Sequence, residues 1–168
     1  INLQNMISTR IKTSQGTFVA TFSEHGLAQL DFPQSRNPKR ANGNGMAKPG
    51  DLRCWQAATV QALKQALTGK NPKALPPLDL NSGTEFQRRV WSALQKISSG
   101  KTRSYSEVAA TIGKPKAARA VGSACGANPI PVLIPCHRVL AANKKLGGFS
   151  GGLNWKRALL SREGISLA

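Results

Sequence analysis

The sequence contains few acidic residues. Only 7 Asp and Glu stand against 24 Lys and Arg among 168 residues, which gives a formal net charge of +17 at pH 7. Such an excess of positive charge attracts polyanions, and nucleic acid is the most common of these. An anionic membrane surface and a merely solvated basic surface are the two competing interpretations. Charge alone favours nucleic acid among the three.

Cysteine is also scarce, and its spacing argues against two classes of protein. Cys54, Cys125 and Cys136 are odd in number and widely separated, unlike a disulfide framework. No Cys-x-x-Cys motif occurs, and only His25 and His137 could assist the thiols as zinc ligands, so we expect no metal or other cofactor. Free thiols predict a reducing compartment: the cytoplasm, with association to the nucleoid in a prokaryote, or the nucleus in a eukaryote.

Long apolar runs are absent. No segment approaches the roughly 20 apolar residues that a membrane-spanning helix needs. Ile1–Arg10 lacks the charged start and apolar block of a secretory signal. The first residue is not Met, which is consistent with a natural chain that begins further upstream. The hydrophobic share of 40% predicts a folded core.

Residues 1–78 are predicted to form a small α/β lobe. Three short segments rich in β-branched and apolar residues, separated by Gly-containing turns, predict an antiparallel sheet; they are Ile7–Thr13, Thr17–Phe22 and Leu27–Phe32. Pro33–Gly50 is predicted to be a loop. Apolar residues at helical spacing predict a helix over Asp51–Thr68. The proline-rich segment Asn71–Pro77 is predicted to link this lobe to the next.

Residues 79–168 are predicted to form a mostly helical lobe. Capping boxes at Thr84 and Ser104 predict two helices, the first reaching about Ile97 and the second stopping at Gly113. Pro115 suits the first turn of a third helix over Lys116–Ala127. The second and third helices, joined by a tight turn, are a candidate helix-turn-helix.

The third predicted helix has an unusual outer face. Arg119, Gly122, Ser123 and Gly126 share one side of it, and each interior glycine costs about 1 kcal/mol relative to alanine. A helix is about 10–12 Å wide and the minor groove of DNA about 6 Å, so small residues favour close approach there, with Arg119 as the single long side chain. Tight packing of this face against another helix is the alternative.

Cys136 follows the segment Asn128–Pro135, which contains three prolines and the apolar run Val132–Ile134. Most buried cysteines act as small hydrophobic residues. Here the rigid support and the following His137 and Arg138 favour a nucleophile instead. A proton path through His137 or nearby cations would raise the thiolate fraction, with a bridging water or a local turn connecting the two side chains.

These residues resemble the O6-alkylguanine-DNA alkyltransferases, also called methylated-DNA–protein-cysteine methyltransferases. The signature is Pro135-Cys136-His137-Arg138-Val139, and about 85 residues of the second lobe agree with the family. The further matching segments are Gly83–Gln87, Ser104-Tyr105, Gly113–Gly122, Asn128–Pro131, Ser150–Gly152, Lys156 and Arg162–Gly164. The first lobe matches only in its order of strands and helix.

The resemblance implies an α/β (α+β) fold with an RNase H-like first lobe and a winged helix-turn-helix in the second. It implies a monomer whose partner is double-stranded DNA containing O6-alkylguanine, with O4-alkylthymine as a second candidate substrate and cooperative binding left open. The recognition helix would enter the minor groove, and the damaged base would flip into a pocket. The residues implied to contact DNA are Ser106, Lys114, Ala118, Arg119, Gly122 and Ser123.

The resemblance also implies the chemistry. Cys136 would accept the alkyl group, His137 would relay its proton through a water, and Glu163 would orient the imidazole. Asn128 would tie the active-site turn to the recognition helix, and Tyr105 would donate a proton or hydrogen bond to the leaving guanine. The implied pocket residues are Tyr105, Pro131, Phe149, Ser150 and Gly151; many relatives have Tyr where this chain has Phe149.

The alkyl group would stay on the sulfur, because a thioether is stable and no second thiol stands nearby in the sequence to remove it. We therefore expect one turnover per molecule. The alternatives are a non-catalytic relative that only binds alkylated DNA, a basic regulator with an inert Cys136, and a Cys–His hydrolase. The hydrolase leaves the small-residue helix unexplained.

Overall fold

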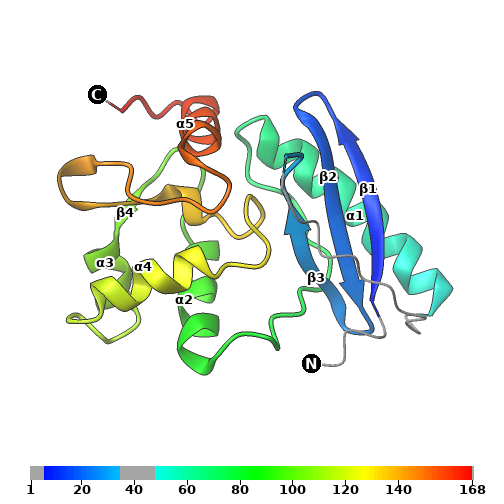
Figure 1. Ribbon diagram of the computed structural model, residues 1–168, viewed down its shortest axis with the longest axis horizontal. Helices are drawn as coiled ribbons and strands as arrows, with labels where there is room; N and C mark the ends of the chain where they lie inside the picture. Colours follow the sequence, from blue (N-terminus) through cyan, green and yellow to red (C-terminus); the bar gives the residue numbers. More distant parts are fainter. Residues whose placement is uncertain (1–5, 35–47, 168) are drawn as a thin grey trace.

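The computed structural model describes residues 6–34 and 48–167. Its N-terminal part is a three-stranded antiparallel sheet in the order β1-β2-β3, made of β1 (Ile7–Thr13), β2 (Gly16–Ser23) and β3 (Gly26–Asp31). Helix α1 (Pro49–Leu67) lies along this sheet (Figure 1). The predicted strands are confirmed, and α1 begins two residues earlier than predicted. Most of the predicted loop Pro33–Gly50 lies outside the described residues.

The C-terminal part is mostly helical, as predicted. Its elements are α2 (Glu85–Gln95), β4 (Arg103–Ser104), α3 (Tyr105–Thr111), α4 (Ala118–Gly126), a 3-10 turn (Cys136–Arg138), β5 (Val139–Leu140), a second 3-10 turn (Ala142–Lys144) and α5 (Leu153–Arg162). Both capping boxes are formed, with the Thr84 and Ser104 hydroxyls accepting the backbone N–H three residues later. The α3–α4 pair forms the helix-turn-helix, and the mixed α and β fold class is confirmed.

Helix α4 is shorter than the sequence predicted. The prediction placed its start at Lys116, with Pro115 in the first turn, but the helix begins at Ala118. Residues 114–117 instead form a separate turn, closed by a hydrogen bond from the Ala117 N–H to the Lys114 carbonyl (2.8 Å). Because of this turn, the basic residues Lys114 and Lys116 lie before the helix and are not part of it.

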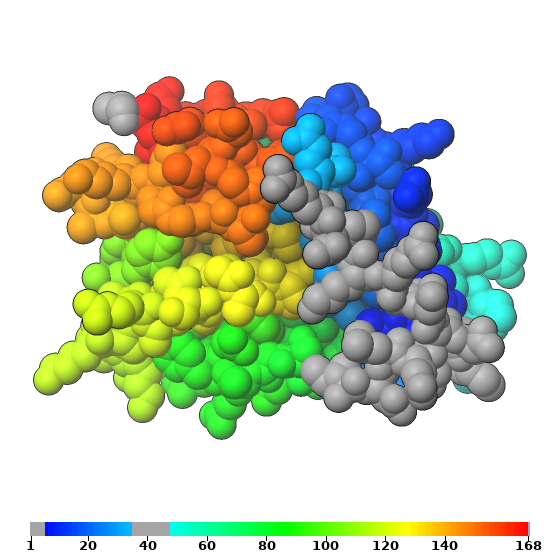
Figure 2. Space-filling view, viewed as in Figure 1, coloured from blue at the N-terminus to red at the C-terminus, as the bar shows by residue number. Residues whose placement is uncertain are grey.

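The inner face of α4 is held by the core. Val121, Ala124 and Cys125 are buried as predicted, whereas Ala117 precedes the helix and is half-buried. The indole N–H of Trp91 in α2 donates to the Ala124 carbonyl at 2.8 Å. The other face of α4 lies at the surface, in yellow between the green α2–α3 segment and the orange segment after Cys136 (Figure 2).

The free edge of β3 joins the two parts of the chain. Leu27 exchanges backbone hydrogen bonds with Pro77 and Asp79, each 2.8 Å long, and the Leu30 N–H donates to the Pro129 carbonyl at 2.9 Å. The predicted linker therefore ends in a β-bridge to the sheet rather than running free. A single hydrophobic core runs through both parts, and the division at residue 78 stays a prediction.

No helix within residues 6–34 and 48–167 is long and apolar enough to span a membrane.

Candidate active site

The segment before Cys136 is a tight, buried turn. The Ile134 N–H donates to the Ile130 carbonyl at 2.9 Å, and every residue from Pro131 to Leu140 is buried. Val132 has a φ of 74°, a left-handed conformation that costs an L-residue about 1–2 kcal/mol. Packing that holds a β-branched residue in this conformation must be extensive. The turn is therefore a rigid support for the cysteine that follows.

Asn128 connects this turn to the sulfur. Its side-chain N–H groups donate to the Ile134 carbonyl at 2.8 Å and to Cys136 Sγ at 3.1 Å, and its Oδ1 accepts the Ile130 N–H at 3.0 Å. Because Asn128 comes two residues after α4 ends, the end of that helix and the sulfur are fixed relative to each other. The resemblance implied that Asn128 ties the active-site turn to the recognition helix. The sequence did not predict its hydrogen bond to the sulfur.

The Cys136 thiol is protonated in the resting protein. Cys136 is only 3% exposed. This burial raises the pKa of its thiol to about 11, although the Asn128 hydrogen bond and the Lys156 charge both lower it. The thiol form therefore predominates over the thiolate at pH 7. The nearby cation acts in the expected direction, because the Lys156 charge lowers the thiol pKa, but loss of solvent outweighs it in this state.

His137 and Arg138 share one buried carboxylate. His137 Nε2 lies 2.9 Å from Glu163 Oε1, and the Arg138 guanidinium donates to both Glu163 oxygens at 2.9–3.1 Å. Burial raises the pKa of Glu163, but the bonds from His137 and Arg138 outweigh it and hold that pKa below its usual value. Burial lowers the pKa of His137, against the pull of Glu163. The imidazole is thus neutral near pH 7 and keeps a capacity to accept a proton.

The second imidazole nitrogen is unpaired. His137 Nδ1 is buried and has no hydrogen-bond partner among the described residues. Cys136, His137 and Arg138 form a single 3-10 turn, so the predicted local turn is present, but the ring bonds Glu163 rather than the sulfur. A buried nitrogen without a partner normally marks a place for a polar ligand or water.

Lys156 supplies a buried cation close to the sulfur. Its ammonium donates to the carbonyls of Val139 (2.7 Å) and Gly148 (3.3 Å), and the residue is 0% exposed. Burial lowers the pKa of Lys156, while the two nearby cysteines raise it. The side chain therefore ties α5 to both β5 and the segment that contains Gly148.

Tyr105 is near enough to Cys136 for the two groups to interact electrostatically. It is half-buried at the start of α3, where burial and the two cysteines raise the pKa of its hydroxyl. The phenol lies against Gly147: a Cβ built at that residue would fall 2.9 Å from the hydroxyl oxygen, and its φ of 65° also favours glycine. Tyr105 therefore stays protonated and can donate a hydrogen bond.

The predicted pocket residues after Gly147 form a short irregular segment, Phe149–Gly151, which we call the lid. Phe149 is half-buried and Ser150 exposed, and a turn closes on the Gly152 N–H, which donates to the Phe149 carbonyl at 3.0 Å. Pro131, the remaining predicted pocket residue, is buried in the turn before Cys136.

The predicted DNA-contacting residues lie at or near the outer face of the helix-turn-helix. Arg119 and Ser123 are exposed on α4, Ala118 and Gly122 are half-buried there, and Ser106 and Lys114 are exposed at α3 and the following turn. The Cβ of an alanine at position 122 would lie 3.8 Å from the Tyr105 ring. The surface of α4 is therefore adjacent to the Tyr105 ring.

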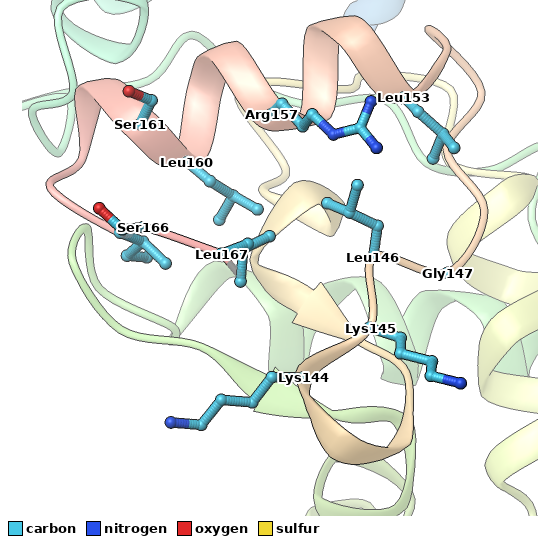
Figure 3. A pocket seen from close by; sticks show the side chains of 11 residues that line it. Lys144, Lys145, Leu146, Gly147, Leu153, Arg157, Leu160, Ser161, Ser166 and Leu167 are labelled. Carbon is cyan, nitrogen blue, oxygen red and sulfur yellow. The ribbon is translucent and has the colours of Figure 1, made fainter.

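A separate cavity of about 540 Å³ lies between α5 and the segment after β5. Leucines and cations line it together, and the cations are Lys144, Lys145 and Arg157 (Figure 3). Neither Cys136 nor any of the residues bonded to it lines this cavity, so it is distinct from the thiol site.

Comparison with known proteins places this geometry in a family. Residues 85–165 match the family model described as 6-O-methylguanine DNA methyltransferase, DNA binding domain. The methylated-DNA–protein-cysteine methyltransferase of Methanosarcina barkeri is 38% identical over 156 residues, which cover 91% of this chain and 94% of that protein. The chain belongs to the methylated-DNA–protein-cysteine methyltransferase family.

Other members of the methyltransferase family agree. The protein of that name from Mycobacterium tuberculosis H37Rv is 60% identical over 107 residues, which cover 64% of each chain. The alignment thus spans less than two thirds of this relative's length. The crystal structure of Mycobacterium tuberculosis OGT in complex with DNA superimposes with a TM-score of 0.75 and 40% identity, covering 92% of this chain and 90% of that one.

Two site residues of this methyltransferase-family chain were not assigned roles from the sequence. Arg138 was noted only as a neighbouring cation, and Lys156 only as a match to the family pattern. Both are long cations that are almost fully buried, at 4% and 0% exposure, which their sequence surroundings do not reveal. Within the described ranges no group of three or more His, Cys, Asp or Glu could hold a metal ion.

The thiol pKa gives a first prediction. The Cys54→Ser variant lacks the exposed thiol and serves as the background for the measurement. In it, the thiolate absorbance at 240 nm that belongs to Cys136 should appear only near pH 11. Adding Cys136→Ala should remove that absorbance and so assigns it. Because the folded pKa lies above the unfolded value, the thiol stabilises the fold fully below about pH 8.5 and ceases to do so as pH rises through about 11. A Cys136 thiolate near neutral pH would contradict the burial argument.

The Glu163 carboxylate, which His137 and Arg138 share, gives a second prediction. Glu163→Gln should lower the free energy of unfolding by about 3 kcal/mol in urea titrations, because Arg138 then becomes a buried charge without a counter-ion. Glu107→Gln is the matched control, since Glu107 is an exposed carboxylate in the α3 capping box. Equal losses in the two variants would show that the Glu163 network contributes no more than a surface pair.

Proposed function

We propose that this chain repairs DNA by moving the alkyl group of O6-alkylguanine directly to Cys136, one group per protein molecule. The observation that supports this most strongly is the setting of the sulfur. Cys136 Sγ accepts a hydrogen bond from Asn128, and the next residue is a buried imidazole bonded to a carboxylate, with its other nitrogen unpaired. A thiol with an adjacent base and an orienting carboxylate is an activatable nucleophile.

The partner is double-stranded DNA, in line with the net charge of +17 and the relative that was crystallised in complex with DNA. The thin outer face of α4 enters the minor groove, and Arg119 takes the place of the extruded base. Ser106, Lys114, Ala118, Gly122 and Ser123 lie at or near this face and contact the strand. The flipped guanine enters between Tyr105, Pro131 and the lid.

The reaction is a single displacement in which the new Cys136 Sγ–carbon bond forms as the carbon–O6 bond breaks. The thiol proton passes through a water to the unpaired Nδ1 of His137, and the Glu163 carboxylate stabilises the imidazolium at Nε2. The electron pair of the broken bond stays on guanine, whose developing negative charge is offset by a proton or hydrogen bond from Tyr105. Where Tyr105 gives its proton to guanine, the phenolate regains a proton from solvent and the His137 imidazolium releases one to solvent, so that overall a proton replaces the alkyl group on the purine and both side chains return to their resting state.

The raised thiol pKa fits this sequence of events. A resting thiolate would be open to other electrophiles, whereas a buried thiol reacts only when a base enters and completes the proton path. Asn128 and Lys156 favour the anion, so the sulfur gains their stabilisation as its proton leaves.

Binding of alkylated DNA without transfer is the alternative function. It would use the same face of α4 but gives no reason for the Asn128–Cys136 bond. O4-alkylthymine is a second substrate candidate. We further propose a monomer that works in the cytoplasm beside the nucleoid, and a division of labour in which residues 79–168 carry the DNA and alkyl sites.

Intact-mass measurement tests the reaction. After incubation with excess O6-methylguanine duplex, the parent should gain one methyl group in an amount equal to the protein present. Cys136→Ala should gain nothing, while Cys54→Ala, which alters an exposed thiol far from the turn, should react like the parent. Continued turnover beyond one equivalent, or an unchanged parent mass, would reject the proposal.

A separate experiment tests Arg119. Arg119→Ala should slow methyl transfer from duplex DNA by about 10- to 100-fold, because opening the base stack costs a few kcal/mol that the arginine offsets. Reaction with free O6-benzylguanine should not change, since no stack has to open. Arg53→Ala, an equal charge loss at an exposed position of α1, is the control. Unchanged duplex affinity and transfer rate in Arg119→Ala would exclude the intruding role.

A further inference from the structure

We propose that Phe32, in the N-terminal part of the chain, is a positioning residue for the lid and so sets how strongly the pocket favours methyl over larger alkyl groups. This inference rests on the proposed function, because it concerns the substrate range of the same site. It assigns a role to a residue outside the family signature and outside the matched segment 85–165.

The lid has little structure of its own. Its regular backbone contacts are the turn from the Gly152 N–H to the Phe149 carbonyl and, just before it, the bond from Lys156 to the Gly148 carbonyl. The first closes the segment into a turn on itself and the second holds the residue before it, so neither joins the middle of the segment to another element. Glycines flank it on each side, so its backbone can adopt many conformations in isolation. The position of its middle must therefore come from side-chain packing.

Phe32 provides that packing. Its ring lies 5.7 Å from the Phe149 ring in an edge-to-face arrangement, 4.9 Å from Trp155 and 5.6 Å from Phe18. Aromatic pairs at these distances contribute about 0.5–1.5 kcal/mol each beyond their burial. Phe32 is thus the aromatic residue that connects the sheet, through Phe18, to both the lid and the start of α5.

Gly151 shows how closely the lid approaches this ring. A Cβ built at Gly151 would lie 2.4 Å from Phe32 Cε2 and 2.7 Å from Cζ, far inside van der Waals contact. The backbone of Gly151 is not in the left-handed region, so its conformation alone does not call for glycine. The close approach to the Phe32 ring is what requires glycine at this position.

The same strand end also holds the opposite side of the site. Leu30, two residues before Phe32, donates its N–H to the Pro129 carbonyl, next to the Asn128 that binds the sulfur. The end of β3 therefore contacts both the turn that carries Cys136 and the lid, and fixes the separation between them. With the Phe32 ring shortened, the lid is free to move outward and the pocket widens.

The matched pair Phe32→Leu and Phe18→Leu tests this role. Each removes one ring from the same cluster, but the ring contacts of Phe18 are with Phe32 and Trp155, not with the lid. The rates of transfer from O6-methylguanine and O6-benzylguanine duplexes are measured with thermal unfolding of each variant. We expect the methyl-to-benzyl rate ratio to fall about tenfold in Phe32→Leu and by much less in Phe18→Leu, which loosens Phe32 but leaves its contact with the lid in place.

A double-mutant cycle isolates the contact itself. Gly151→Ala should slow methyl transfer about tenfold in the parent, where the new Cβ meets the Phe32 ring, and about twofold in Phe32→Leu, which lacks the two nearest ring atoms. Gly148→Ala is the control, because a Cβ there meets nothing within 4 Å; its effect should be equal in both backgrounds.

The outcomes separate the two proposals. If the parent transfers no alkyl group, the proposed function fails. If the parent transfers but the rate ratio is unchanged in Phe32→Leu, or the effects of Gly151→Ala and Phe32→Leu are additive, the positioning role of Phe32 is overturned while the repair activity stands.

Discussion

The Glu163 carboxylate is the interaction on which the site depends. It lies at the end of α5 and bonds both His137 and Arg138, two adjacent side chains that are almost fully buried. Without that negative charge the guanidinium would be an uncompensated ion in the core. With it, the turn after Cys136 is fixed to α5 and to the Ile97 carbonyl at the end of α2, which Arg138 also binds. One acidic group, in a chain that has only 7, thus orders three elements around the sulfur.

Much of the fold followed from local chemistry. The strands and the starts of α2 and α3 were predicted because alternation and capping boxes act within a few residues. The start of α4 was misplaced, since Pro115 fits a turn as well as a helix. Cys136 could be selected by its neighbours and by resemblance. Its pKa could not, because that value depends on burial by the core and on the opposing effects of Asn128 and Lys156, which the residues next to Cys136 do not reveal.

One side of the site is rigidly packed, and the other side is held by few contacts. The turn at Val132 is so well packed that it holds a strained backbone, and Asn128 binds the Cys136 sulfur beside it. The lid on the opposite side has only end contacts and the Phe32 ring. Such a division suits the proposed transfer, in which a purine enters while the sulfur stays in place, because only the side that admits the base has to yield.

The use of the β3 edge has a consequence for association between chains. A three-stranded sheet has two open edges, and each can pair with a strand from another molecule and start aggregation. Bonds from Leu27 and Leu30 to the C-terminal part occupy the β3 edge. On the other edge, β1 carries Arg10 and Lys12, whose charges repel a second copy. The contacts that place the turn before Cys136 therefore also occupy one sheet edge, and the described edge that remains, β1, carries charges that disfavour stacking of like chains.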